Sequence, residues 1–378
     1  MDNAIAIEDE GPSDEEFITP EPEIEIEDHL GSGRAADDEE PVPLEYTITS
    51  YGADYPVDGL VSRIQNGDVY VPTFQRGYVW TRKRASRFIE SLLLGLPVPG
   101  IFLSREGVSN KLLVIDGQQR LKTLQYFYDG EFAGSGRTFS LVGVQSKFEG
   151  LTFKALDPDY RRKLDDSIIH ATVLQQDVPS EDDSSIYHVF ERLNTGGTLL
   201  SAQEIRSAIY YGSFANLLRE LNKNDHWRAI YGRPSIRMRD QELILRFFTL
   251  LHDLDRYERP FKLFLNKFMG RNRALTKFTA EELSDSFIST ISLAREALGD
   301  QAFRPSRALN AAVYDSVMVG LGRRLTAGPI SDLPAIKIAY DALLIDRDFQ
   351  KSTQFATADL ERIEDRLRLA TEAFASVG

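Results

Sequence analysis

The chain of 378 residues contains no cysteine, which excludes a disulfide framework and any zinc site with thiolate ligands. Apolar residues make up 42 % of the sequence, enough for a packed core, yet no uninterrupted apolar stretch approaches the roughly 20 residues that span a bilayer. The start, Met-Asp-Asn followed by acidic residues, lacks the basic end and apolar run of a signal peptide. We therefore expect a cytoplasmic protein without a membrane-spanning segment.

Several catalytic motifs are also missing from the sequence. The pattern G-x-x-x-x-G-K-S/T does not occur, which excludes a P-loop nucleotide site, and neither G-x-S-x-G nor H-E-x-x-H is found. The five histidines are scattered. Asp225-His226 resembles the start of a histidine-metal nuclease motif, but no matching asparagine and second histidine follow, so we interpret His226 as structural.

The acidic excess is confined to the first part of the chain. Residues 1–40 hold 16 Asp or Glu and one Arg, a net charge of −15, whereas residues 41–378 carry 43 basic and 42 acidic side chains. The net charge of −14 therefore says nothing against a phosphate-bearing partner of the rest of the chain.

Residues 1–43 combine acidic runs with five prolines, a composition that buries too little apolar surface to offset the entropy of ordering. We predict a disordered acidic tail that keeps the protein in solution. A sharper hypothesis is that the tail competes with nucleic acid for basic surface elsewhere on the chain.

Hydrophobic periodicity places the secondary structure after the tail. Apolar residues at helical spacing predict a helix over residues 81–94, while short apolar runs predict strands over 101–103, 112–115 and 168–173. Beyond residue 180 the pattern is helical almost to the end, and Ser201-Ala202-Gln203-Glu204 forms a capping box. We therefore predict an α+β protein, with an α/β domain over residues 44–180 and a helical domain over residues 181–378.

The most informative stretch joins the predicted strand 112–115 to a helix through Asp116-Gly117-Gln118-Gln119-Arg120. Glycine at such a turn lets the backbone approach a ligand, and the first amides of a helix together with an arginine form an anion site. The two glutamines can donate to phosphate or sugar oxygens, and Asp116 can hold a metal ion or a ribose hydroxyl. An ordinary polar turn in which Asp116 caps the helix explains the same residues.

Two other polar clusters carry the same kind of ambiguity. Phe74-Gln75-Arg76-Gly77-Tyr78-Val79-Trp80 suits an anionic or planar ligand, although Tyr78 and Trp80 also fit a hydrophobic core. Asn194-Thr195-Gly196-Gly197 is either the end of a helix, with glycine at positive φ, or the far wall of the same pocket.

Three motifs occur together and in one order. They are Val71-Pro72 with Phe74-Gln75-Arg76 and Val79-Trp80, then Ile115-Asp116-Gly117-Gln118-Gln119-Arg120-Leu121, then Phe190-Glu191-Arg192-Leu193-Asn194 with Gly196-Gly197. In this order they resemble the DUF262 family, and the similarity covers most of residues 57–250. The family is similar to the ParB/sulfiredoxin superfamily, whose folds bind nucleotide phosphates at a strand–turn–helix ending in arginine.

The resemblance implies a nucleotide site, with Mg²⁺ as the expected metal and a nucleoside triphosphate as the ligand. The implied catalytic residues are Asp116, Gln119 and Arg120, with Asp116 also as metal ligand. The implied nucleotide-binding residues are Gln75, Arg76, Gly117, Gln118, Arg120, Thr123 and Asn194.

DUF262 proteins resemble components of bacterial anti-phage and modification-dependent restriction systems, in which this domain regulates DNA cleavage by a histidine-metal nuclease domain. No such nuclease signature occurs here. The sequence therefore predicts a nucleotide-binding, NTP-hydrolysing regulator or sensor that acts with a separate nuclease and can form homo-oligomers. The alternatives are a DNA-binding module of the ParB-like fold without catalysis, and a metal-dependent DNA nickase.

Overall fold

The computed structural model describes residues 24–25, 47–71, 78–106, 110–178, 187–189, 191 and 200–378. The chain divides into two compact units. The sheet unit comprises Gly33–Glu220 and His252–Ser284, and the helical unit comprises Met1–Ser32, Leu221–Leu251 and Asp285–Gly378. The domain limits expected from the sequence, at residues 43 and 180, stay a prediction, as does disorder of the tail, which lies outside the described residues except for Ile24–Glu25.

A five-stranded mixed sheet organises the sheet unit, in the order β2-β6-β4-β5-β3. β2 pairs antiparallel with β6, β6 parallel with β4, β4 antiparallel with β5, and β5 parallel with β3. The strands are β2 (Thr47–Pro56), β3 (Val69–Tyr70), β4 (Ile101–Arg105), β5 (Leu112–Asp116) and β6 (Ile168–Val178). The central pair β4–β5 thus carries the predicted strands 101–103 and 112–115.

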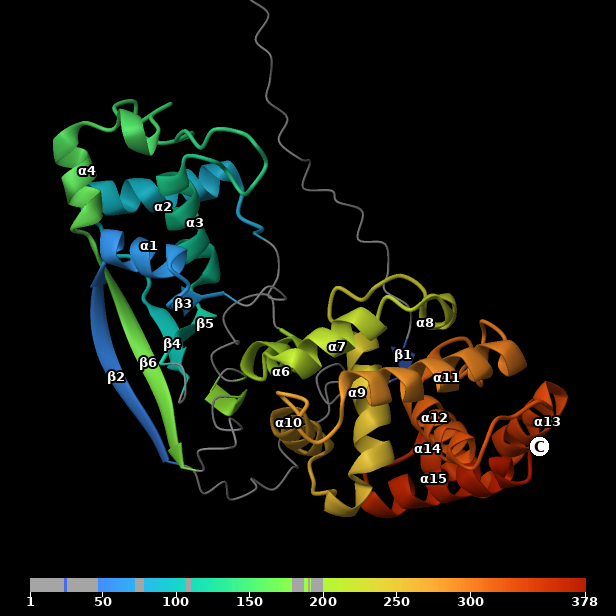
Figure 1. Cartoon of the computed structure of the whole chain (residues 1–378). Helices are drawn as coiled ribbons and strands as arrows, with labels where there is room; N and C mark the ends of the chain where they lie inside the picture. The colour runs from blue at the N-terminus through green and yellow to red at the C-terminus, as the bar shows by residue number, and fades with distance from the viewer. Residues whose placement is uncertain are drawn as a thin grey trace, which may run out of the picture. The chain divides into compact units, whose positions relative to one another are not determined.

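Four helices share one hydrophobic core with this sheet (Figure 1). They are α1 (Val57–Gln65), α2 (Arg82–Leu94), α3 (Gln118–Asp129) and α4 (Pro158–Asp165). The predicted helix 81–94 is confirmed: the Thr81 hydroxyl caps α2, and Gly95 ends it in the left-handed conformation. Residues such as Phe88, Ile89 and Leu103 are buried between helices and strands.

The remaining helices of the sheet unit follow the sheet in sequence. They are α6 (Ala202–Ile209), α7 (Ser213–Leu221) and α10 (Phe261–Arg271). The capping box is confirmed, because the Ser201 hydroxyl accepts from the Glu204 amide while the Glu204 carboxylate accepts from the Ser201 amide. Buried Arg206 of α6 donates to Asn266 of α10, which ties these two helices together.

The helical unit consists mainly of helices packed on one another. They are α8 (Asp225–Tyr231), most of α9 (Arg239–His252) and of α11 (Ala280–Leu298), α12 (Ala311–Thr326), α13 (Leu333–Ile345), α14 (Arg347–Gln354) and α15 (Leu360–Ala375). A two-stranded parallel sheet joins β1 (Ile24–Glu25) to β7 (Leu309–Asn310). The predicted α+β class, with a sheet-bearing N-terminal part and a helical C-terminal part, is confirmed. None of the described helices has the length and apolar character needed to cross a membrane.

Candidate functional site

The turn between β5 and α3 is built on Gly117. This residue precedes the first turn of α3 with a φ of 102°, a conformation that side chains disfavour. A Cβ atom at this position would lie 2.4 Å from Ile101 Cγ2, so the turn is pressed against the start of β4. The close approach requires glycine and lets the strand pass directly into the helix.

Asp116 and Arg120 form an ion pair across this turn. Arg120 Nη2 donates to Asp116 Oδ2 over 2.6 Å. The Asp116 side chain is 58 % exposed and that of Arg120 is 15 % exposed, so the guanidinium lies against the protein while the carboxylate faces solvent. Arg120 Nε is buried and has no hydrogen-bond partner. The pair therefore places one accessible anion and one largely covered cation at the N-terminus of α3.

Gln119 and Thr123 hold a neighbouring segment onto α3. Gln119 Oε1 accepts from the Val79 amide over 3.0 Å and from the Trp80 amide over 3.3 Å. One turn further along, the Thr123 hydroxyl donates to the Gln119 carbonyl and accepts from the Tyr78 hydroxyl, each over 2.7 Å. Two α3 side chains thus fix residues 78–80, which follow the Phe74-Gln75-Arg76 motif in sequence.

Tyr78 keeps its proton because it is buried. The ring packs edge-on against Tyr126 and Phe132, and burial raises the pKa of Tyr78 to about 12 in spite of its hydrogen bond to Thr123, which lowers it. The hydroxyl is therefore a donor at any physiological pH, in keeping with the role of the Thr123 oxygen as acceptor.

Comparison with protein families adds an independent observation. Residues 57–211 match the model of the GmrSD restriction endonuclease N-terminal domain. This part of the chain is similar to a restriction-system domain. The match begins with α1, includes the Asp116–Arg120 turn and ends after α6, so α7 to α15 lie outside it. No curated protein matches the chain.

The structure places only some of the predicted site residues of this restriction-type domain. Asp116, Gly117, Gln118, Gln119 and Arg120 lie in one turn, and Thr123 follows them on α3. Gln75, Arg76 and Asn194 lie outside the described residues, so their part in the site stays a prediction.

Two features of the site were not predicted from the sequence. Gln119 contacts the backbone of residues 78–80 rather than only facing a ligand, and no local pattern signals a contact between positions 40 residues apart. Lys122 on α3 is half-buried, and burial lowers its pKa. A single lysine in a helix is ordinarily read as a solvent-facing residue, and here the site gains a second partly covered cation.

Metal ligands are sparse around this turn. Among the residues that the structure describes, no three or more His, Asp or Glu side chains form a group that could hold a metal ion. Asp116 offers a single exposed carboxylate. That suits Mg²⁺, which is held by one or two carboxylates together with water and substrate phosphates, and it does not suit a metal held by protein ligands alone.

Proposed function

We propose that the sheet unit binds and hydrolyses a nucleoside triphosphate at the Asp116–Arg120 turn, as a regulatory or sensor component of a bacterial restriction system that acts with a separate nuclease. The observation that carries this proposal is the strand–glycine–helix turn with an arginine on its first helical turn. Its position inside the range similar to a restriction endonuclease N-terminal domain supports the biological setting.

The turn has the physical properties of a phosphate site. The first amides of a helix point away from its axis and carry the positive end of the helix dipole, so anions bind there. The 12-residue helix α3 starts at Gln118 with glycine as its N-cap, which removes any side chain between these amides and a ligand. Arg120 adds a planar guanidinium, which pairs with phosphate through two parallel hydrogen bonds.

Binding at this turn requires the Asp116–Arg120 pair to change partners. A triphosphate brings more negative charge than one carboxylate, so we assign Arg120 to the phosphates and Asp116 to the Mg²⁺ that accompanies them. Because Asp116 is mostly exposed, it exchanges Arg120 for hydrated Mg²⁺ without leaving a buried charge behind. Mg²⁺ would neutralise charge that develops on the phosphates during transfer.

The neighbouring residues divide into binding and positioning roles. Gln118, at the first position of α3, is the residue that we assign to the attacking water or to a phosphate oxygen. Gln119 and Thr123 position residues 78–80 and thereby the preceding motif with Gln75 and Arg76. Asn194 completes the proposed nucleotide contacts.

Calorimetric titration with ATP and GTP in the presence of Mg²⁺ tests the site. Arg120→Ala removes charge-assisted hydrogen bonds that contribute about 1.5–3 kcal/mol, so nucleotide affinity should fall about 10- to 150-fold. Arg162→Ala on α4 is the matched control, because its side chain is 72 % exposed and makes only a long ion pair with Asp159. Unchanged affinity in the Arg120 variant, or an equal loss in both variants, contradicts the assignment.

The role of Gln119 is tested by comparing two substitutions. Gln119→Glu keeps an oxygen acceptor for the Val79 and Trp80 amides, whereas Gln119→Ala removes it. If Gln119 acts by positioning, nucleotide hydrolysis should survive in the Glu variant and fall in the Ala variant. Equal loss in both would show that the amide group itself contacts the nucleotide or the attacking water.

A further inference from the structure

The two-stranded sheet of the helical unit joins parts of the chain that are far apart in sequence. β1 pairs parallel with β7, with Ile24 opposite Leu309 and Glu25 opposite Asn310. Residues 26–46 then lead from β1 to β2, which belongs to the sheet unit. The acidic N-terminal part of the chain is therefore attached to the helical unit by a strand and to the sheet unit by the chain itself.

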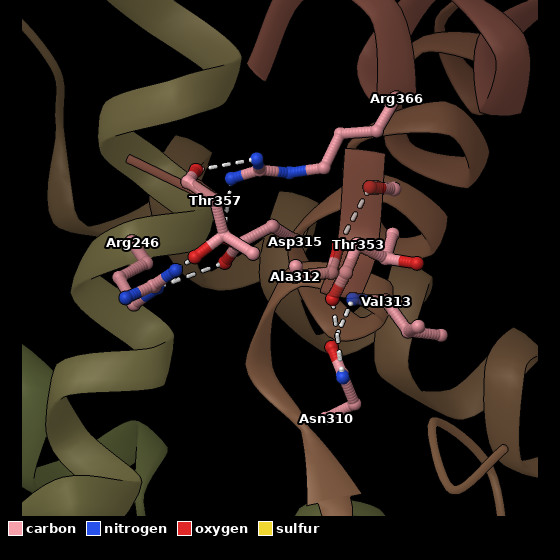
Figure 2. Close-up of polar contacts among 9 residues, drawn as sticks. Arg246, Asn310, Ala312, Val313, Asp315, Thr353, Thr357 and Arg366 are labelled. Carbon is pink, nitrogen blue, oxygen red and sulfur yellow. Dashed lines mark hydrogen bonds and ion pairs between the residues drawn. The ribbon is translucent and has the colours of Figure 1, made fainter. Parts of the chain in front are cut away.

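β7 presents β1 with a backbone that is already fixed. The Asn310 amide donates to the Phe303 carbonyl over 2.9 Å. The Asn310 side chain caps α12, since Oδ1 accepts from the Val313 amide over 3.0 Å, while Nδ2 donates to the Thr353 carbonyl over 3.4 Å (Figure 2). Three contacts hold this residue, so the strand that pairs with it meets an ordered edge rather than a loop.

The surroundings of β7 are positively charged. The 16-residue helix α12 begins directly after Asn310, and the positive end of its dipole therefore lies at β7. Deeper in the same unit, Arg246 and Arg366 both contact Asp315 on α12 (Figure 2). The sequence on either side of β1, Glu21-Pro22-Glu23-Ile24-Glu25-Ile26-Glu27-Asp28, carries only negative charge.

We infer that the segment around Ile24–Glu25 is a docking strand, and that β7 with the N-terminus of α12 is its binding site on the helical unit. The site takes a parallel strand in which β-branched apolar residues alternate with acidic ones. Ile-Glu-Ile-Glu has this alternation, which puts the isoleucines on one face of a strand and the glutamates on the other. The pairing is a short form of β-strand addition, in which backbone hydrogen bonds supply affinity and alternate side chains supply specificity.

The occupant is the chain's own segment, bound within the same molecule. A strand pair of two residues is too short to be stable between separate molecules. Residues 26–46 tether β1 to the rest of the chain, and a flexible tether of this kind gives a local concentration in the millimolar range. Tethering therefore makes a short pairing effective, and it keeps the acidic segment on the helical unit.

The sequence offers a matched control, because the dipeptide Ile-Glu occurs at both Ile7-Glu8 and Ile24-Glu25. The chain has no native cysteine, so a pair of introduced cysteines can only react with each other. In the variant Glu25→Cys with Asn310→Cys, the two residues are register partners on strands about 4.8 Å apart, within the range that a disulfide bridges. The control, Glu8→Cys with Asn310→Cys, shares any effect of removing the α12 cap.

Disulfide formation is measured in a glutathione buffer on non-reducing gels. The Glu25 pair should form an intramolecular disulfide about tenfold faster than the Glu8 pair, since pairing raises the local concentration above that of the tether alone. Adding Ile24→Asp should reduce the rate to the control value, whereas Ile7→Asp should leave it unchanged. Equal rates in the two pairs overturn the inference, and so does a disulfide-linked dimer, which would assign the site to a second copy.

Hydrogen exchange provides a measurement that does not depend on the cysteine variants. In the unsubstituted full-length chain, amides of Ile24 and Glu25 should exchange several-fold more slowly than those of Ile7 and Glu8, because backbone pairing protects amides. Ile24→Asp should remove this difference. Equal exchange of the two dipeptides in the unsubstituted chain contradicts the docking strand.

Discussion

Two aspartate–arginine pairs in this protein have the same hydrogen-bond length and different environments. Arg120 donates to Asp116 over 2.6 Å in the sheet unit, and Arg246 donates to Asp315 over 2.6 Å in the helical unit. The Asp116 side chain is 58 % exposed, whereas that of Asp315 is fully buried. The distance alone therefore does not distinguish a pair that can bind a ligand from one that holds the fold.

The difference lies in what each pair joins. Asp116 and Arg120 are four residues apart on one turn, so the pair links no distant elements. Asp315 on α12 is held by Arg246 from α9 through two hydrogen bonds and also contacts Arg366 from α15, whose Nη1 donates to the Thr357 carbonyl (Figure 2). Removing a charge from the second arrangement leaves buried charges uncompensated, whereas water replaces a missing partner in the first.

The largest expected effect follows from replacing the buried aspartate. Asp315→Ala leaves two arginines of the helical unit without this carboxylate, and breaking a buried pair costs about 3–5 kcal/mol in the free energy of unfolding. The control is Asp341→Ala on α13, where the carboxylate is 55 % exposed and contacts Lys337. Urea unfolding measures both variants. A loss below about 1 kcal/mol for Asp315→Ala would place this pair in the same class as surface pairs.

A smaller loss is expected from the glycine that shapes the exposed site. Gly117→Ala forces a side chain into the positive-φ region, which costs about 1–3 kcal/mol, and its Cβ overlaps Ile101. Gly134→Ala separates the two causes, because Gly134 also has a positive φ but nothing lies within 4 Å of the added atom. The overlap predicts a larger loss of unfolding free energy at Gly117 than at Gly134. Equal losses would mean that the turn is not pressed against β4.

Local patterns of the sequence predicted much of the sheet unit. The helix expected at residues 81–94 is α2 at Arg82–Leu94, and the strand expected at 112–115 is β5 at Leu112–Asp116. β2 was missed, because Gly52 and Asp54 occupy its exposed positions and break any apolar run. Its pairing with β6, more than 100 residues away, supplies the order that its own composition does not.

The two aspartate–arginine pairs differ in the same way in how far they could be predicted. The Asp116–Arg120 spacing of four residues at a helix start signals a local pair. Asp315, Arg246 and Arg366 each lie in a helical pattern where a charged side chain normally faces solvent. Their burial depends on the packing of α9, α12 and α15, which no local pattern encodes. The contacts of Gln119 with Val79 and Trp80 were missed for the same reason.

The hydroxyl of Tyr78 tests how firmly residues 78–80 are held beside the exposed pair. Tyr78→Phe removes the hydrogen bond to Thr123 and should lower the free energy of unfolding by about 1 kcal/mol at neutral pH. The folded-state pKa of about 12 exceeds the usual value of about 10, so the unfolded chain loses this proton first. The free energy of unfolding of the unsubstituted chain therefore falls as pH rises from about 10 to about 12.

The phenylalanine variant lacks this titration, so its stability deficit should shrink over the same alkaline range. Thermal unfolding of both chains at matched pH values measures the difference, in which the other tyrosines cancel. A deficit that stays constant between neutral and alkaline pH would show that Tyr78 titrates alike in the folded and unfolded chain.

The smallest effect on stability is expected where the effect on binding should be large. Asp116→Asn keeps the shape of the side chain and removes its charge, and an exposed pair contributes only about 0–1 kcal/mol to the free energy of unfolding. If Asp116 exchanges Arg120 for Mg²⁺, nucleotide affinity in the variant should no longer increase when Mg²⁺ is added, while affinity without metal should be kept or rise because a negative charge has gone. A variant that responds to Mg²⁺ as the unsubstituted chain does would leave Asp116 as a partner of Arg120 alone, and the exposed pair would then be structural like the buried one.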